Sequence, residues 1–405
     1  MSKREDNYAH QNTLSSKEYR VLFSRFEKPG IEFSKQRKGF NRHDMPMVLQ
    51  TMSHSKRFAE SVSRDLKKDR FEKQKNGESV PGIPSGSWMM KKPRKLDPAR
   101  ADRWCGGNVN CIPRRARREG LARSGCTVAA DVSGPGHYGD SLGERMRTSK
   151  PRNGTSKFPS HLTLHTVSRD YNIPLDAKTV LNGDRAVTSL LQMPKKPGRR
   201  GPAVGAVLAD REFFSAAAIN GLQDGGRKFL MPAAKNARVK KAITEVDAGT
   251  RGAASRFHIT GTRTKEKAPF NLLVVRRDGC DKDAPITDQC AAFATNLPVC
   301  TRKELADVLP EEYRRRWIVE TGFRTIKDVL AKTCSRRLHV RRILFYFALL
   351  SYGLWRPGQY YDLRHGNLAG GKSFAIVSFV KCMATAAEQL IKWEKHHGNF
   401  KWQIP

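Results

Sequence analysis

The chain has 405 residues, which is enough for two or three domains and a sizeable core. It carries 75 Lys and Arg against 39 Asp and Glu, a formal net charge of +36 and a pI near 10.2. So large an excess of one sign repels itself in a compact fold unless a polyanion is bound. Nucleic acid is therefore the first candidate partner, and an anionic membrane surface is the second.

The sequence argues against a membrane protein and against a secreted one. The longest apolar run, residues 343–355, is shorter than the roughly 18 to 20 residues that span a bilayer, so we expect a buried core helix there. The first ten residues, MSKREDNYAH, have no apolar signal region. The eight cysteines include no CxxC pair, and Cys105 with Cys111 would be only half of a zinc site. We expect free thiols in a reducing cytoplasm, in a protein associated with the nucleoid.

Residues 1–100 hold 23 basic against 12 acidic residues and read as a basic helical region that ends in a linker. Helices are predicted over Ser15–Lys28 and from Pro46 to about Lys75, whereas the prolines of residues 77–98 predict a linker. Two interpretations stay open for this region. It is either a helical module that grips a DNA end or a partly disordered basic arm.

From residue 126 onward the pattern changes to short apolar strands with helices between them. The predicted strands are Cys126–Val132, His161–Val167, Ala203–Asp210 and Lys228–Pro232, and the predicted helices are Asp184–Gln192 and Phe214–Leu222. Two of the strands are buried apolar runs that lead directly into a carboxylate, at Asp131 and at Asp210. An Asp at the end of a strand is often only a turn or helix cap, so each is weak evidence alone. Asp170 and Asp184 compete with them, but neither ends a buried run.

Residues 311–330, EEYRRRWIVETGFRTIKDVL, are predicted to form one helix. At about 100° per residue, four side chains fall within roughly 60° of one another on this helix: Tyr313, Arg316, Glu320 and Lys327. The simplest explanation is a solvated face with Arg316 and Glu320 as an i,i+4 pair. A lone carboxylate among many cations is better suited to holding a metal ion beside a phosphate.

The spacing of these four residues resembles the YREK signature of insertion-sequence DDE transposases. Tyr313, Arg316, Glu320 and Lys327 match it without a gap, and VAADVSG around Asp131 and VLADREFF around Asp210 resemble the segments of the first two catalytic aspartates. FATNLP, residues 293–298, is similar to the segment that leads back to the glutamate helix. The resemblance implies a metal-binding catalytic triad of Asp131, Asp210 and Glu320.

The resemblance also implies an α/β fold. It is an RNase H-like mixed sheet flanked by helices, with a β-rich insertion and a helical basic N-terminal region. The expected divisions are a DNA-binding region and linker (1–100), a first core segment (101–232), the insertion (233–289), a second core segment with the YREK helix (290–356) and a helical tail (357–405). Within the insertion, RFHIT and NLLVV alternate as strands do.

Two positions depart from the family pattern. Glu212 stands where relatives commonly have Gly, which adds a fourth acid near the site. The insertion holds no Trp, although relatives that cut through a DNA hairpin stack a flipped base on a Trp of that domain. A hairpin route would therefore require Phe257 or Phe270 as a substitute.

The chemistry implied is cleavage of a DNA strand at the element's end, followed by attack of its 3′-hydroxyl on target DNA. Two divalent ions held by three carboxylates suit this reaction, and oxygen ligands favour Mg²⁺, with Mn²⁺ able to replace it. Tyr313, Arg316 and Lys327 would position phosphates of the end DNA. More distant backbone contacts are expected from Arg324, Arg336, Arg337, Arg341 and Arg342.

The expected partners are the terminal inverted repeats and the target DNA, bound by a homodimer in the synaptic complex, with no membrane involved. Three alternatives stay open at this point: a non-catalytic domesticated transposase that binds DNA, an RNase H-like nuclease of repair, and a basic RNA-binding protein. Inverted repeats flanking the reading frame would favour the mobile element.

Overall fold

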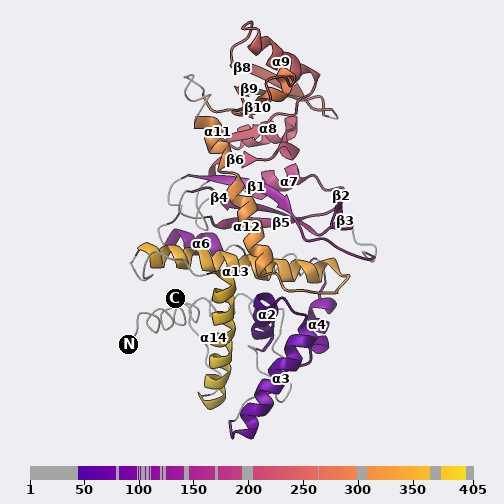
Figure 1. Ribbon diagram of the computed structural model, residues 1–405, viewed down its shortest axis with the longest axis vertical. Coiled ribbons are helices and arrows are strands. Elements are labelled where there is room, and N and C mark those ends of the chain that lie inside the picture. The colour runs from indigo at the N-terminus through magenta and orange to yellow at the C-terminus, as the bar shows by residue number, and fades with distance from the viewer. Residues whose placement is uncertain are drawn as a thin grey trace. The chain divides into compact units, whose positions relative to one another are not determined.

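The computed structural model forms two compact units (Figure 1). It describes residues 44–78, 82–97, 111–118, 125–140, 146–168, 172–193, 204–262, 264–298, 308–364 and 375–397, together with residues 99, 101, 105, 109 and 121. One unit comprises Met1–Arg115, Pro135–Pro159 and Phe323–Pro405, and the other comprises Ala116–Gly134 and Ser160–Gly322. These units cross the five predicted divisions, because the 101–232 and 290–356 segments each contribute to both. The predicted helix Ser15–Lys28 lies outside the described residues.

The first unit is mainly helical. Its elements are α2 (Asp44–Ser55), α3 (Ala59–Lys75), α4 (Gly86–Lys95), the long α13 (Leu338–Arg364), α14 (Ile376–His397) and a hairpin of β2 (Arg147–Arg152) with β3 (Thr155–Phe158). In Figure 1, α2, α3, α4 and α14 lie on one side of α13. The apolar run at residues 343–355 is the buried middle of α13, as predicted. No helix among the described residues is long and apolar enough to cross a membrane.

Two predictions for the basic N-terminal region are wrong. The single helix expected over Pro46–Lys75 is broken, because Lys56 takes a left-handed backbone conformation (φ 56°) between α2 and α3. The expected linker contains α4, which tolerates Pro93 in its last turn and is capped by Ser85, whose hydroxyl accepts a hydrogen bond from Trp88 N at 3.3 Å.

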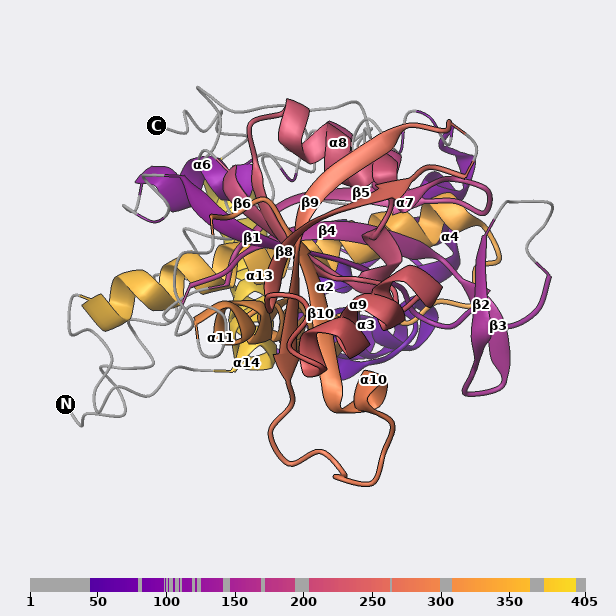
Figure 2. The same cartoon turned by 90° about the horizontal axis from the view of Figure 1, so that it is seen from above.

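The second unit is built on an eight-stranded mixed sheet in the order β5-β4-β1-β6-β7-β10-β9-β8. Its strands are β1 (Cys126–Ser133), β4 (Ser160–Thr166), β5 (Pro174–Val180), β6 (Val204–Ala209), β7 (Lys228–Pro232), β8 (Ala254–Thr260), β9 (Lys267–Arg276) and β10 (Cys290–Thr295). An antiparallel meander, β5-β4-β1, is followed by β6 and β7, both parallel to β1. This is the predicted RNase H-like sheet. The strands of the predicted insertion, β8 and β9, continue the same sheet through β10 (Figure 2).

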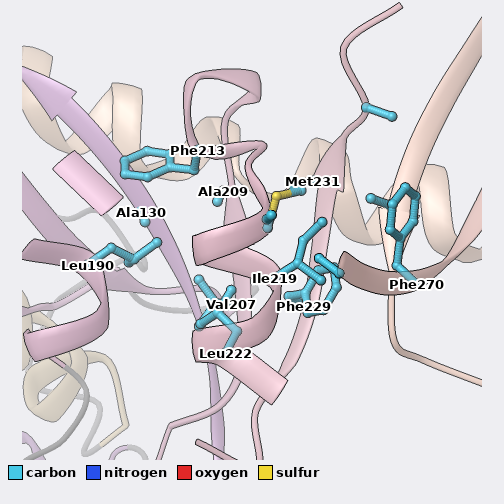
Figure 3. Close-up of a cluster of buried hydrophobic side chains, with 14 of the residues drawn as sticks. Ala130, Leu190, Val207, Ala209, Phe213, Ile219, Leu222, Phe229, Met231 and Phe270 are labelled. Carbon is cyan, nitrogen blue, oxygen red and sulfur yellow. The ribbon is translucent and has the colours of Figure 1, made fainter. Parts of the chain in front are cut away.

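The helices of this unit cover the two faces of the sheet differently. The covering elements are α7 (Ala186–Gln192), η2 (Arg211–Phe213), α8 (Ala216–Asp224), α9 (Ala237–Asp247), α10 (Ile286–Gln289) and α11 (Leu309–Arg314). On one face α7, η2, α8 and α9 bury the main core, where Ile219 and Leu222 of α8 approach Val207 and Phe229 (Figure 3). On the other face α11 covers a smaller cluster that includes Leu208 and Leu230. The helix α12 (Trp317–Asp328) runs from the second unit into the first, and α6 (Cys111–Arg118) also crosses the boundary.

Candidate active site

The two predicted catalytic aspartates come from adjacent parallel strands. Ala130 of β1 is paired with Ala209 of β6, and Asp131 and Asp210 each follow by one residue. The carboxylates therefore occupy neighbouring positions on strands that lie about 4.8 Å apart. Asp210 is also the cap of η2, since one of its carboxylate oxygens accepts a hydrogen bond from Arg211 N at 2.7 Å. The Asp210 side chain can therefore cap η2 and also be one of the predicted catalytic aspartates.

The alternation of strand side chains decides which face these acids occupy. Val128 and Ala130 point into the main core under α7 and α8, so Asp131 points to the opposite face. On β6, Leu208 belongs to the smaller cluster beneath α11. Asp210 is two residues further along, so its side chain points to the same face as Leu208. Both aspartates are thus directed to the face that carries α11.

The predicted YREK helix is two helices. The helix α11 ends at Arg314, Arg315 and Arg316 form a turn, and α12 begins at Trp317. Tight i→i+3 hydrogen bonds carry the chain through this turn, from Arg316 N to Tyr313 O at 2.9 Å and from Val319 N to Arg316 O at 3.0 Å. Tyr313 and Glu320 therefore stand on separate helices.

The Arg316 guanidinium lies between two of the predicted metal ligands. Its Nη2 donates to Glu320 Oε1 at 2.7 Å, and its Nη1 is 3.9 Å from Asp131 Oδ1. The side chain of Arg316 is 11% exposed, against 17% for Asp131 and 28% for Glu320. The expected i,i+4 pair is present, but the same cation also reaches across to the first strand.

The protonation of Asp131 reports how closely the acids gather. Burial, with smaller contributions from the negative charges of Asp210 and Glu320, raises the pKa of Asp131 from 3.8 to about 6, although Arg316 and a backbone hydrogen bond oppose this rise. Burial would lower the pKa of Arg316, but Tyr313 and the three carboxylates outweigh burial and raise it. All three predicted triad members therefore act electrostatically on one guanidinium.

Tyr313 lines the same site from α11. Its ring packs against Phe293 with centroids 5.1 Å apart, and the Arg316 guanidinium lies 5.7 Å from the ring centre. Burial is the main cause that raises the pKa of the Tyr313 hydroxyl to about 12. Its hydroxyl is thus held protonated at neutral pH and remains a hydrogen-bond donor.

The remaining predicted DNA contacts differ in accessibility. Arg324 and Lys327 are exposed on α12, and Arg336 and Arg337 are exposed before α13. Arg341 is half-buried and its Nε donates to Ser335 O at 2.8 Å. Arg342 does not fit its predicted role, because its side chain is buried, with the residue 4% exposed, and a phosphate contact needs an accessible cation.

The residues expected to compete with the triad or to modify the site are also placed. Asp184 accepts a hydrogen bond from Leu181 N at 3.0 Å and closes a turn, while Asp170 lies outside the described residues. Glu212 is exposed on η2. Neither Asp184 nor Glu212 is among the groups that shift the pKa of Asp131.

Neither candidate for base stacking offers a free aromatic face. Phe270 is buried in the core, and Phe257 is half-buried with the guanidinium groups of Arg238 and Arg251 at 5.2 and 5.7 Å from its ring centre. The suggested substitution for the missing Trp is therefore not supported by this arrangement.

The carboxylates of Asp131, Asp210 and Glu320 are of the chemical type that binds a divalent ion. The register of β1 with β6 places the two aspartates on adjacent strands, and the charges of Asp210 and Glu320 raise the pKa of Asp131. Among the described residues, however, no group of three or more His, Cys, Asp or Glu side chains is gathered closely enough to hold a metal ion. Arg316 supplies positive charge between Asp131 and Glu320 instead. The acids thus fit a metal ion by chemical type and by the strands that carry them, but their present spacing does not form a metal site, and the guanidinium lies between two of them.

Known families and solved structures provide an independent comparison. Residues 183–354 match the family described as "Transposase DDE domain", a segment that includes Asp210 and Glu320 but not Asp131. This segment therefore resembles a transposase DDE domain. The prediction of a DNA-cutting enzyme of the DDE transposase class is confirmed by this match, and such enzymes use divalent metal ions.

Among solved structures, this chain is similar in fold to a piggyBac transposase synaptic complex with hairpin DNA, determined by cryo-electron microscopy. The TM-score is 0.55 at 10% sequence identity, over 96% of this chain and 82% of that chain. No curated protein matches the sequence significantly. At such low identity the similarity supports the fold, and the residues of the site must be argued from the transposase's own geometry.

A polar stripe on β4 was not predicted from the sequence. His161, Thr163 and His165 alternate with apolar residues in HLTLHTV and are all fully buried. Their pairing with β1 places them on the face that carries Asp131, since Thr163 is directly opposite Asp131. The signal was available in the alternation, which put polar side chains on one face of a strand that is buried on both.

Proposed function

We propose that the protein is an insertion-sequence transposase that cleaves DNA strands at element ends and transfers the resulting 3′-hydroxyl to target DNA. The observation that carries the proposal is the convergence of Asp131, Asp210 and Glu320 on one guanidinium, on one face of an RNase H-like sheet. Two of these acids lie within the matched transposase DDE domain.

The three carboxylates would hold two Mg²⁺ ions, which Mn²⁺ could replace. Bound there, the ions would supply a nucleophilic hydroxyl and neutralise charge at the phosphate. The protein itself would contribute hydrogen-bond donors and positive charges that contact the phosphate. The protonated Tyr313 hydroxyl can donate to a phosphate oxygen, and Arg316 can exchange its carboxylate partners for a phosphate.

A cavity of about 980 Å³ beside Tyr313 supports DNA as the substrate. Its walls include four arginines, Arg251, Arg276, Arg277 and Arg314, against a single acidic residue, Asp278. Some of this charge is already partnered, since Arg314 lies 3.2 Å from Glu311 and Arg251 lies 2.9 Å from Glu245. The remaining excess of cations next to the acids is suited to the phosphates that flank a scissile bond.

The test is Glu320→Gln, which keeps the size of the side chain and removes its charge. Metal-dependent cleavage of the terminal inverted repeats should fall at least about 1000-fold, while binding of the same DNA in EDTA is retained. Glu311→Gln is the matched control, because Glu311 is an exposed acid on the neighbouring helix α11. Undiminished cleavage by Glu320→Gln would refute the assignment.

A transposase-derived protein that binds DNA without cutting is the second candidate. The observation that favours it is the ion pairing of Arg316 with Asp131 and Glu320, which neutralises part of the acidic charge without a metal. In that case the wild-type chain would bind the repeats equally well with Mg²⁺ or EDTA and leave them intact. The homodimer and its synaptic complex belong to the first proposal and would be seen as paired ends in the same binding assay.

A further inference from the structure

A buried hydrogen-bonded connection links the polar stripe on β4 to the helix that carries Glu320. His165 is opposite Ala129 in the β1–β4 ladder, so it lies on the same face as Asp131, one pair of residues away. Its Nδ1 is 2.7 Å from Oδ1 of Asn172, which follows β4. Both side chains are fully buried.

Asn172 is also hydrogen-bonded to the backbone of α12. Its Nδ2 donates to the carbonyl oxygen of Ile318 at 2.5 Å, within the first turn of the helix. A carbonyl oxygen has two lone pairs, so this contact can coexist with the hydrogen bond inside the helix. Hydrogen bonds are directional, whereas apolar packing such as that of the buried Val319 leaves a helix free to slide by small amounts.

A glycine permits the helix to come this close. A Cβ added at Gly322 would stand 3.0 Å from Cε1 and 3.1 Å from Nδ1 of His165, and 3.1 Å from Nδ2 of Asn172. Glycine inside a helix costs about 0.5–1 kcal/mol relative to alanine. The close contact with His165 and Asn172 gives a physical reason for accepting that cost here.

The two contacts bracket Glu320. Ile318 and Gly322 are one turn apart on α12, and Glu320 lies midway between them. Because Glu320 is about 160° around the helix from Gly322, the flank with Gly322 rests on β4 while the flank with Glu320 faces away from it. Movement of the helix at Gly322 therefore changes the reach of Glu320 toward the aspartates.

We propose that His165, Asn172 and Gly322 are positioning residues that set the distance of Glu320 from Asp131 and Asp210, and thereby the affinity of the site for divalent ions. This inference rests on the proposed function, in which those acids bind metal. Partners that orient metal ligands typically change metal affinity or activity by about 10- to 100-fold when they are removed. A helix moved by a fraction of an ångström is enough for such an effect.

The test uses the full chain with Fe²⁺ and ascorbate, which cut a polypeptide near a bound iron. The variants are Gly322→Ala and Asn172→Ala, with Gly205→Ala as the matched control, because a Cβ at Gly205 meets other atoms only at ordinary distances of 3.5 Å or more. The first two should need about 10- to 100-fold more Fe²⁺ for half-maximal cutting near residues 131, 210 and 320, with repeat-DNA binding in EDTA unchanged. The control should behave as the wild type does.

A double variant separates positioning from general damage. If the new Cβ acts by displacing the His165 imidazole, the double variant His165→Ala with Gly322→Ala should need no more Fe²⁺ for half-maximal cutting than His165→Ala alone. Additive losses, or equal losses of thermal stability, DNA binding and iron affinity, would show a merely structural role and overturn the inference. A wild-type chain that gives no iron-dependent fragments at the three acids would instead refute the proposed function, and the inference with it.

Discussion

Replacing Asp131 by Asn should stabilise the protein in the absence of metal, although it removes a predicted catalytic group. The pKa of Asp131 is raised from 3.8 to about 6, chiefly by burial. At pH 7 the folded protein therefore holds an ionised carboxylate in a site that disfavours its charge. One pKa unit corresponds to about 1.4 kcal/mol, so removal of the charge should raise the free energy of unfolding by about 3 kcal/mol.

The pH dependence follows from the direction of this shift. Between about pH 4 and pH 6 the folded wild type binds more protons at Asp131 than the unfolded chain does, so its stability falls as the pH rises through this window. Above pH 6 the destabilisation is fully developed. The advantage of Asp131→Asn should thus be largest at pH 7 to 8 and should disappear toward pH 4.

Differential scanning fluorimetry of both proteins from pH 4 to 8 measures the effect. At about 2–4 °C per kcal/mol, Asp131→Asn should melt roughly 6–12 °C higher at pH 7 in EDTA. Mn²⁺ at 100 times its dissociation constant should add about 2.7 kcal/mol to the free energy of unfolding of the wild type and so raise its melting temperature, and it should stabilise the variant much less. A variant that melts lower than the wild type at pH 7, or a difference that does not change with pH, would refute the reasoning.

Three further substitutions test the core, the site and the helical unit. Phe213→Ala removes a fully buried ring and should cost about 3–5 kcal/mol in thermal unfolding, whereas Phe58→Ala, at a residue 47% exposed, should stay within about 0.5 kcal/mol. Tyr313→Phe keeps the packing against Phe293 and removes the hydroxyl, so gel-shift affinity for the repeats should drop about 10-fold with no loss of stability. The difference in affinity between wild type and Tyr313→Phe should stay constant to pH 9, because the pKa of about 12 keeps this hydroxyl protonated. Gly86→Ala would place a Cβ 2.3 Å from the backbone of α3 and should lower the melting temperature.

The fold was predictable where one local signal dominated. The apolar runs that end at Asp131 and Asp210 became β1 and β6, and the alternation in RFHIT and NLLVV became β8 and β9. The order of strands was not readable from the residues themselves, because long-range pairing depends on packing between distant segments. The resemblance to transposases supplied the fold class, an RNase H-like mixed sheet, and the structure supplied the order of its strands.

The predictions that were wrong share a physical cause. The helical periodicity of the sequence continues through Arg315 and Arg316 and through Lys56, yet the helix is interrupted at both places. Propensity is a weak guide where a segment must bend to pack against its neighbours. The prolines of residues 77–98 suggested a linker, but Pro93 is tolerated near the end of α4.

Under the proposed function, the charges of the site would link metal binding to DNA binding. Asp131, Asp210 and Glu320 bring three negative charges at neutral pH, and Arg316 offsets one of them, so the half-buried site keeps a net negative charge. A phosphate brought to such a site is repelled unless further positive charge arrives with it. Divalent ions should therefore increase the affinity for the scissile phosphate, and DNA should increase the affinity for the ions by the same factor. In this proposal Arg316 would move to the phosphate as bound ions neutralise its carboxylate partners, so the guanidinium would couple the two binding events.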